Sequence, residues 1–278
     1  MAKRLGFVDD ALDNFHANTY LDAVRGPLAE RGWEVAGATA LQQDAGRAWA
    51  DSKRVAYYDS PAELADAVDA IAVLAPSTPE THLGLCEAVL SAGKPTFVDK
   101  TFAPDAATAQ QIFDLADRHA APIQTTSALR TTNVQTLAGQ LEAPLEGVAV
   151  WAGGASWHEY GVHPVELAVS CLGPDAERIT ACGTDTRPVM AIEFSGGRVA
   201  TIHFDAGEYV PFVAMLTTRL GVRHVEVDDS RLFVDAAAAI LDFFDAGRAL
   251  VPRDETMAVM RVLDASGRPE ARHGWHTL

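Results

Sequence analysis

The stretch "VLAPSTPETHLGLCEAVLSAGKPTFVDKTFAPD" (Val73–Asp105) decides the fold. It begins as an apolar strand pattern and continues as a helical pattern with Pro79 at its start and Gly93 at its end. It then returns to a short apolar run, Thr96–Val98. Strands that alternate with helices imply a parallel sheet covered on both faces. The stretch therefore predicts one βαβ unit of such a sheet.

The same alternation extends through the first part of the chain. Helical patterns separate most of the apolar runs, which are Arg4–Val8, Trp33–Thr39, Val55–Tyr58, Ala70–Ala75, Thr96–Val98 and Ile123–Thr125. We expect an α/β domain of the Rossmann-like, doubly wound type over residues 1–126, whose last helix has Asp105 as its N-cap or Pro104 as its first residue.

The remaining residues, 127–278, have a different pattern. A strand-like segment and a helix, Val162–Leu172, precede a succession of extended runs, in which Ser195-Gly196-Gly197 is a hairpin turn signal. Two further helical patterns follow at Leu232–Ala246 and Glu255–Ala265. Successive strands followed by helices predict a C-terminal α+β domain with a mostly antiparallel open sheet. The polar tail from Gly267 is expected to be loosely ordered.

Composition excludes several classes of partner. The chain has 278 residues and a formal net charge of −16, which argues against nucleic acid and anionic membranes as partners. No apolar run reaches the roughly 18 residues of a membrane span, and no signal peptide is evident. Three unclustered cysteines in apolar surroundings predict buried thiols in a reducing cytoplasm. A small-molecule substrate remains open.

Two motifs carry a family resemblance. The first contains Pro76-Ser77, His82, Gly93-Lys94 and Asp99-Lys100-Thr101; the second, "EYGVHPVE", contains Glu159, Gly161, His163 and Glu166. Their order and their separation of about 60 residues resemble the glucose–fructose oxidoreductase / inositol dehydrogenase (Gfo/Idh/MocA) family.

This resemblance implies NAD(P)-dependent oxidation of a hydroxyl of a sugar, cyclitol or related small polyol. It assigns proton transfer beside the substrate carbon to Lys100 and His163, and it places Pro76, His82 and Asp99 on the cofactor side. The open sheet of the second domain, with "PVMAIEFSGG" (188–197) and "RVATIHFDAG" (198–207), would be the interface of a homodimer or homotetramer.

The residues themselves support part of this assignment. Lys100 follows a predicted parallel strand, and open α/β sheets bind ligands at that edge. His163 and Glu166 are three residues apart on a predicted helix and share a face, so a carboxylate could orient a histidine base. A structural lysine, and a buried histidine that braces the helix start, are the alternatives.

The segment "GFVDDALDNFH" (Gly6–His16) departs from a dinucleotide-binding loop. Alignment on His16 puts Val8, Asp10 and Asp13 at the three usual glycine positions. Carboxylates there repel phosphate, and a like-charge pair at about 4 Å costs roughly 1 to 4 kcal/mol. The usual acid after the second strand is also missing, since the first one is Asp44. NAD or NADP is therefore a doubtful cofactor. The alternative for Asp13 or Asn14 is a structural role, because either residue would serve as the N-cap of the first helix.

Further polar residues suggest a substrate site or a metal site. Arg130 would bind an anionic group or form an ion pair between the two domains, and His158, Glu159 and Tyr160 precede His163. The spacing matches no strong metal signature, so we expect no metal; the weak alternative ligand set is His158, His163, Glu166 and His203. The alternative functions are a cofactor-free or metal-assisted lyase or isomerase on a sugar-like substrate, and a non-catalytic ligand-binding protein.

Overall fold

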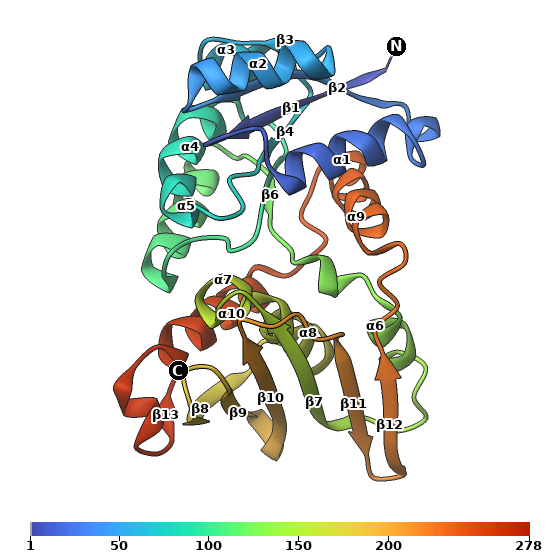
Figure 1. Ribbon diagram of the computed structural model, residues 1–278, viewed down its shortest axis with the longest axis vertical. Coiled ribbons are helices and arrows are strands. Elements are labelled where there is room, and N and C mark those ends of the chain that lie inside the picture. Colours follow the sequence, from blue (N-terminus) through green and yellow to red (C-terminus); the bar gives the residue numbers. More distant parts are fainter. Residues whose placement is uncertain (1) are drawn as a thin grey trace. The chain divides into compact units, whose positions relative to one another are not determined.

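The computed structural model describes residues 2–278, which form two compact units (Figure 1). The first unit ends at Thr126 and also takes up Phe233–Pro252; the second comprises Ser127–Leu232 and Arg253–Leu278. The return of Phe233–Pro252 to the first unit differs from the expected continuous second domain, 127–278. Of the helices in residues 2–278, none combines the length and the apolar character that crossing a bilayer requires.

The first unit contains a six-stranded sheet, and its strand order is β3-β2-β1-β4-β5-β6. All neighbouring strands pair in parallel, which confirms the doubly wound α/β fold. The strands are β1 (Lys3–Asp9), β2 (Trp33–Ala40), β3 (Ala56–Tyr57), β4 (Ala70–Val73), β5 (Thr96–Val98) and β6 (Ile123–Gln124). Because the order changes direction at β1 and β4, the carboxyl ends of these two strands flank the point where such sheets bind ligands.

Helices cover both faces of this sheet (Figure 1). They are α1 (Phe15–Arg25), α2 (Gln43–Lys53), α3 (Pro61–Ala67), α4 (His82–Val89), α5 (Ala106–Arg118) and α9 (Leu232–Ala246). Asp105 caps α5, as the sequence predicts, and accepts the Thr108 N–H at 2.6 Å. Helix α3 lies so close to β2 that a Cβ on Gly37 would come within 2.6 Å of Leu64 Cδ1. A larger residue at Gly37 would force the helix away from the sheet.

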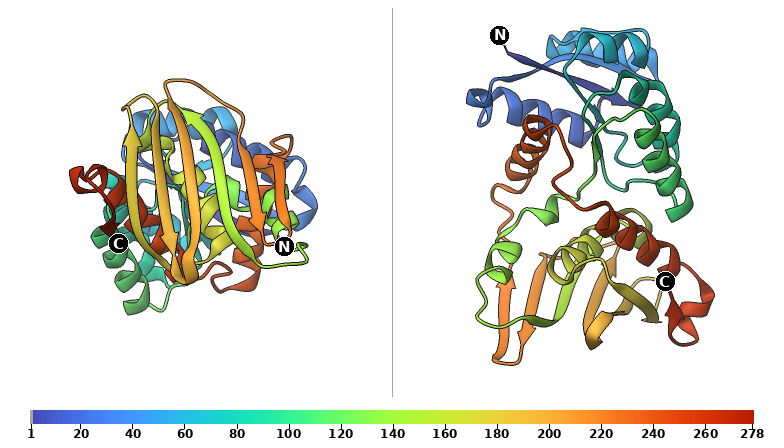
Figure 2. Two further views of the ribbon diagram at one scale, coloured as in Figure 1. Left: turned by 90° about the horizontal axis from the view of Figure 1, so that it is seen from below. Right: turned by 180° about the vertical axis from the view of Figure 1, so that it is seen from behind.

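Helix α9 completes the first unit, although it comes more than a hundred residues after β6. Its Phe233 ring lies edge-on to Phe15, with 4.8 Å between centroids, and its Phe244 ring is 5.5 Å from Trp33. The Trp33 indole N–H also donates to Asp245 at 2.9 Å. Figures 1 and 2 both place α9 beside α1. The helix therefore packs against aromatic side chains on α1 and at the start of β2.

The second unit contains a seven-stranded sheet, and its strand order is β12-β11-β7-β10-β9-β8-β13. Only the β7–β10 pair is parallel, which confirms a mostly antiparallel sheet. The strands are β7 (Leu145–Gly154), β8 (Ala176–Gly183), β9 (Pro188–Phe194), β10 (Arg198–Ala206), β11 (Val213–Thr218), β12 (Gly221–Glu226) and β13 (His276–Thr277). Strand β13 belongs to the tail expected to be loose; that expectation is wrong, because the tail pairs with β8.

One face of this sheet is covered by helices, and Figure 2 shows the other face without a helix over it. The helices of this unit are α6 (Asn133–Ala138), α7 (Trp157–Tyr160), α8 (Val162–Leu172) and α10 (Arg253–Ser266). The strands alternate accordingly: Met190, Ile192 and Phe194 of β9 are buried, and the residues between them are half-exposed. Cys86 is buried and Cys171 is half-buried, but Cys182 is exposed, so the prediction of three buried thiols is wrong for Cys182.

Candidate functional site

The carboxyl edge of the first sheet carries a buried acid, Asp9, at the end of β1. Asn14 Nδ2 donates to Asp9 Oδ2 at 2.8 Å, and the Ala11 N–H donates to Oδ1 at 3.2 Å. Burial raises the pKa of Asp9 to about 7, against the effect of these hydrogen bonds. Asp9 therefore carries only part of a negative charge at neutral pH.

Helix α1 begins at this same loop. Asn14 is its N-cap and accepts the Ala17 N–H at 3.0 Å, so of the two predicted caps it is Asn14 that acts. Asp13 instead accepts from Asn18 Nδ2 at 3.1 Å. Among residues 2–278, the N–H groups of Phe15 and His16 have no hydrogen-bond partner. These two groups leave the start of α1 available to an anion.

The three residues aligned with the glycines of a dinucleotide-binding loop, Val8, Asp10 and Asp13, differ in their exposure to solvent. Val8 is fully buried within β1 and belongs to the core. Asp10 is half-exposed, and the Gln42 N–H donates to its carbonyl at 3.0 Å; Asp13 is exposed. A dinucleotide would therefore fit this edge through the free N–H groups of α1. Two solvent-accessible carboxylates would weaken its hold on the pyrophosphate.

A second acid on this edge, Asp99, organises the end of β5. His16 Nδ1 lies 2.5 Å from Asp99 Oδ2, and Asp99 Oδ1 accepts the Lys100 N–H at 2.8 Å. Burial opposes ionisation of Asp99, but the charges of His16 and Lys100 outweigh it and lower the pKa of Asp99. The Lys100 side chain is nearly buried, and its Nζ donates to the Pro76 carbonyl at 3.2 Å. The structure thus brings His16, Asp99, Lys100 and Pro76 together.

His82 lies in the interior of the first unit and does not have a position in which it could contact a ligand. Its ring is fully buried, and Nδ1 lies 3.0 Å from the Phe102 carbonyl oxygen. Its Nε2 lies 3.0 Å from the carbonyl oxygen of Leu74 and 3.1 Å from that of Ala75. Both ring nitrogens therefore tie the end of β4 to the segment after β5. His82 shapes this edge from beneath.

In the second unit, His163 is held by a residue that the sequence did not indicate. Ser127 Oγ lies 2.6 Å from His163 Nδ1. The rings of Tyr160 and Phe212 flank the imidazole, with centroids 5.7 and 6.2 Å away. A Cβ on Gly154 would lie 2.4 Å from the Tyr160 ring, so only glycine leaves room for this tyrosine. The imidazole is thus fixed by a hydroxyl and two aromatic rings.

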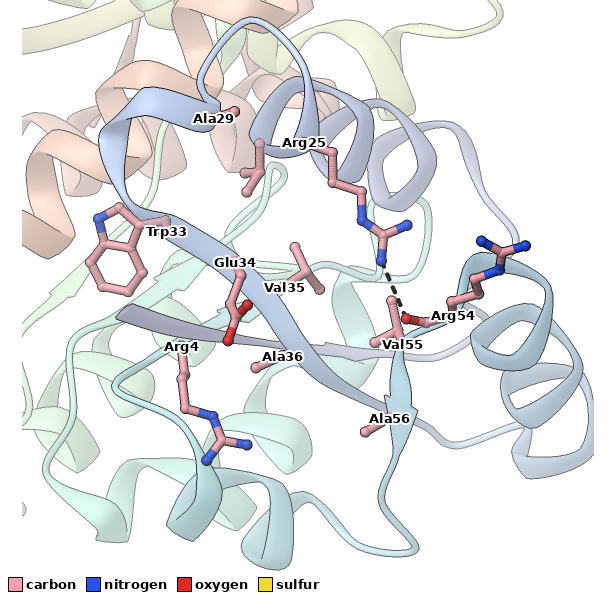
Figure 3. A pocket seen from close by; sticks show the side chains of 11 residues that line it. Arg4, Arg25, Ala29, Trp33, Glu34, Val35, Ala36, Arg54, Val55 and Ala56 are labelled. Atoms are coloured by element: carbon pink, nitrogen blue, oxygen red, sulfur yellow. Dashed lines mark hydrogen bonds between the residues drawn. The ribbon is translucent and has the colours of Figure 1, made fainter. Parts of the chain in front are cut away.

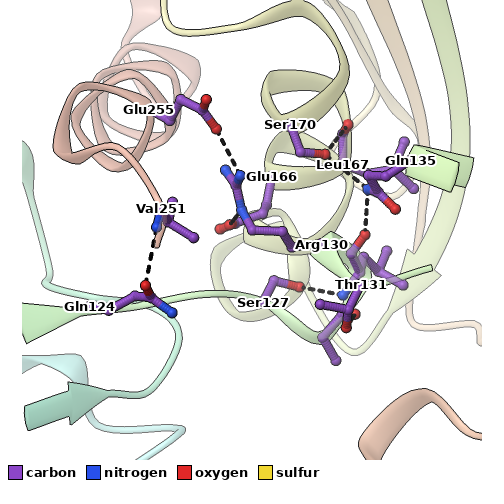
Figure 4. A network of polar contacts seen from close by, with 12 residues as sticks. Gln124, Ser127, Arg130, Thr131, Gln135, Glu166, Leu167, Ser170, Val251 and Glu255 are labelled. Atoms are coloured by element: carbon purple, nitrogen blue, oxygen red, sulfur yellow. Dashed lines mark hydrogen bonds and ion pairs between the residues drawn. The ribbon is translucent and has the colours of Figure 1, made fainter. Parts of the chain in front are cut away.

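The predicted pairing of Glu166 with His163 is replaced by a buried ion-pair network (Figure 4). Arg130 Nε donates to Glu166 Oε1 at 2.6 Å, and Arg130 Nη1 lies 2.7 Å from Glu255 Oε2 without hydrogen-bond alignment. Burial raises the pKa of Glu166, while the charge of Arg130 opposes the rise. Arg130 therefore forms ion pairs within the second unit, which differs from the predicted ion pair between the two domains.

The residues before His163 lie on or beside α7, which Ser156 caps by accepting the Glu159 N–H at 3.2 Å. His158 is exposed, whereas Glu159 and Tyr160 are half-buried. His203 stacks on Trp151 on β7, with 4.7 Å between ring centroids. Within residues 2–278, no group of three or more His, Cys, Asp or Glu side chains could hold a metal ion. The alternative metal set is therefore not brought together.

A separate pocket lies at the amino ends of β1 and β2 (Figure 3). Its volume is about 470 Å³, and Arg4, Arg25 and Arg54 are among its lining residues. The Arg25 guanidinium donates to the Lys53 carbonyl at 2.7 Å. None of the predicted site residues lines this pocket, which is on the edge opposite Asp9 and Asp99.

The first unit has a parallel sheet with Lys100 at its carboxyl edge, and the second unit has a mixed open sheet. Residues 15–127 match the model of an oxidoreductase family with an NAD-binding Rossmann fold, Gfo/Idh/MocA. The similarity to this family is shown for residues 15–127, which make up most of the first unit. No curated protein matches it by sequence.

Solved structures agree in fold over the whole chain. A myo-inositol dehydrogenase from Lactobacillus casei, in complex with NAD(H) and myo-inositol, is 14% identical with a TM-score of 0.84, covering 100% of this chain and 97% of that chain. A scyllo-inositol dehydrogenase from the same organism, with NAD(H) and scyllo-inositol, is 11% identical with a TM-score of 0.81, covering 100% and 99%. GenD2 from gentamicin A biosynthesis, in complex with NAD, is 16% identical with a TM-score of 0.81, covering 100% and 97%.

Proposed function

We propose that the chain is an oxidoreductase that moves a hydride between a hydroxyl-bearing carbon of a sugar, cyclitol or related polyol and a nicotinamide cofactor. The observation that carries the proposal is Lys100, nearly buried at the carboxyl end of β5 and adjacent to Asp99. The match of residues 15–127 to an oxidoreductase family with an NAD-binding Rossmann fold supports the cofactor class. The inositols bound in two structures of the same fold support the substrate class.

The cofactor would be held first by the start of α1, where the N–H groups of Phe15 and His16 are free. When bound, the nicotinamide supplies the hydride acceptor or donor. Asp10 and Asp13 oppose the pyrophosphate, so we expect NAD(P) affinity to be low and to improve at higher ionic strength. Asp9 adds to this repulsion only above neutral pH, because its pKa is about 7.

Lys100 is assigned to proton transfer at the substrate oxygen. The Pro76 carbonyl accepts from its Nζ at 3.2 Å and so fixes where the amino group stands. Loss of a hydride from carbon requires loss of the hydroxyl proton, and a positioned amine can accept it. Arg130 is excluded from anion recognition in this proposal, since Glu166 and Glu255 already neutralise it.

Cofactor and substrate titrations test the function. NADH and NADPH are added separately to the protein and binding is followed by thermal shift at low and moderate salt. Inositols, aldoses and polyols are then screened with NAD or NADP for absorbance of the reduced nicotinamide. Reduction of cofactor by at least one polyol, lost in Lys100→Met, is the expected result. Absence of both binding and turnover would refute the proposal.

We also propose that the chain is a homodimer or homotetramer formed through the uncovered face of the second sheet. Met215, Ala149, Thr201 and Ala191 are register partners on four neighbouring strands, and each is half-exposed. This row carries no charge, which suits a second copy of the same surface. Light scattering should report an oligomer for the wild type and a monomer for Thr201→Lys. A wild-type monomer would contradict the proposal.

A further inference from the structure

We propose that Asp10 makes the chain selective for NAD over NADP, because its carboxylate lies at the end of β2, where the 2′-phosphate of NADP would be bound. The inference rests on the proposed function, since it requires a bound dinucleotide. It concerns only the adenosine end of that cofactor, and all the residues it uses belong to the first unit. Asp10 is in this role a specificity-determining residue and not a catalytic one.

The contacts of Asp10 place it beside the residues that follow β2. The hydrogen bonding between β1 and β2 continues past both strands, since the Leu41 N–H donates to the Asp9 carbonyl at 3.0 Å. One residue further on, the Gln42 N–H donates to the Asp10 carbonyl, also at 3.0 Å. The side chains meet as well, because Gln42 Nε2 donates to Asp10 Oδ2 at 3.4 Å. Both the backbone and the carboxylate of Asp10 are therefore held against Gln42.

The end of the second strand is where a dinucleotide-binding sheet distinguishes the two cofactors. An acid at this position binds the ribose 2′-hydroxyl of NAD, whereas a nearby arginine accommodates the 2′-phosphate of NADP. The residues that follow β2 in this chain, Leu41–Gln43, include no acid. The neighbouring strand supplies one instead, because Asp10 extends β1 alongside Gln42. The acid that the sequence lacks after β2 is thus present in space.

The charges around the end of β2 also disfavour a 2′-phosphate. Arg47 on α2 is the basic residue nearest in sequence to the end of β2. Its guanidinium is paired with Asp59 and lies 4.7 Å from the centre of the Tyr57 ring, so its charge is already balanced. The start of α2 would attract an anion, but Asp44 in the first turn offsets that attraction. A 2′-phosphate would be repelled by Asp10 and Asp44, and the uncharged 2′-hydroxyl of NAD would not.

Binding of NADH and NADPH tests the selectivity without any activity assay, because the two cofactors differ only in the 2′-phosphate. Isothermal titration at low salt measures both dissociation constants in the absence of substrate. We expect wild type to bind NADH about tenfold more tightly than NADPH, and this ratio should shrink as salt is added. In Asp10→Asn, which keeps an oxygen for Gln42, NADPH affinity should rise until the two cofactors bind within about threefold of each other.

Asp13→Asn is the matched control. Asp13 is an exposed acid of the same loop, but its carboxylate accepts from Asn18 Nδ2 of α1, at 3.1 Å, rather than from a residue that follows β2. Removal of this charge should change the affinity for NADH and for NADPH by the same factor. The ratio of the two dissociation constants should therefore stay as it is in wild type.

The outcomes separate this proposal from the proposed function. Equal affinity of wild type for NADH and NADPH, or an unchanged ratio in Asp10→Asn, would overturn the role of Asp10 and leave the proposed function intact. The same loss of selectivity in Asp13→Asn would show a general effect of loop charge, and would also overturn the role of Asp10. Binding of neither cofactor to wild type or to Asp10→Asn would refute the proposed function, and the selectivity with it.

Discussion

The two units stabilise buried charge in opposite ways. On the edge of the first sheet, Asp99 has His16 beside it and a lowered pKa, whereas Asp9 has only neutral hydrogen-bond donors and a pKa of about 7. In the second unit, one guanidinium, Arg130, lies between Glu166 and Glu255. The second arrangement is a self-contained structural network. On the edge of the first sheet, Asp9 has no cation beside it and lies where a ligand is expected. A buried acid with a shifted pKa is typical of a ligand-binding site.

Removal of the lysine should have the largest effect. We predict that Lys100→Met lowers the rate of polyol oxidation by about 10²–10⁴-fold, because a positioned proton-transfer group typically contributes that much. Folding should be little changed, since the Pro76 carbonyl loses only one donor. Steady-state kinetics measure the effect, and Lys53→Met on α2 is the control. Equal rates in both variants would remove Lys100 from the site.

Breaking the network of the second unit should have the next largest effect. Arg130→Met leaves Glu166 buried without its cation, and we predict a loss of about 3–5 kcal/mol in the free energy of unfolding. Denaturant titration measures it. Arg178→Met removes an exposed ion pair with Glu193 and should cost at most about 1 kcal/mol. Similar losses in the two variants would mean that burial of the network is unimportant.

The buried acid of the first unit should make stability depend on pH. An unfolded Asp has a pKa near 3.9, and folding raises that of Asp9 to about 7. Between these values the folded state binds more protons, so Asp9 costs stability increasingly from about pH 4 to pH 7 and constantly above. Asp9→Asn should therefore stabilise the protein by up to about 4 kcal/mol at pH 8 and by little at pH 4.

Unfolding of wild type and Asp9→Asn at several pH values measures this difference. The asparagine keeps an oxygen that can accept from Asn14 and Ala11, so hydrogen bonding is nearly conserved. A difference that stays constant between pH 4 and pH 8 would contradict the raised pKa of Asp9.

The exposed acids of the same loop should have the smallest effect. We predict that Asp10→Gly/Asp13→Gly increases NADH affinity about tenfold at low salt, because it removes two like charges near the pyrophosphate. The gain should shrink as salt is added. Isothermal titration measures it, with Asp114→Asn on helix α5, which removes one carboxylate away from this loop, as the control. An unchanged affinity would show that the pyrophosphate lies elsewhere.

Local sequence patterns were sufficient for most of the fold. The helices at Val162–Leu172 and Leu232–Ala246 have the expected bounds, because their apolar periodicity is strong. Strand β8 was missed, since its exposed residues Glu177 and Arg178 interrupt the apolar pattern. The packing of α9 in the first unit could not be predicted either. Apolar periodicity indicates which face of a helix is buried, but it does not indicate which element that face packs against.

The site was predictable only where position along a strand determines it. Lys100 and Asp99 follow β5, so their place on the carboxyl edge follows from the parallel sheet. The contact of Ser127 with His163 joins residues 36 apart, and no spacing rule indicates it. Glu255 was one acid among several at the start of a helix, and only the fold brings it to Arg130.

The late position of α9 also bears on how the protein is made. A ribosome has already released the whole of Lys3–Gln124, with all six strands of the first sheet, before residues 233–252 exist. Until then Phe15 and Trp33 lack the aromatic partners that α9 brings. The first unit therefore begins to emerge first, but it can be completed only after most of the second unit, Ser127–Leu232, has been made. During most of synthesis it is an incomplete globule with aromatic surface open to a chaperone.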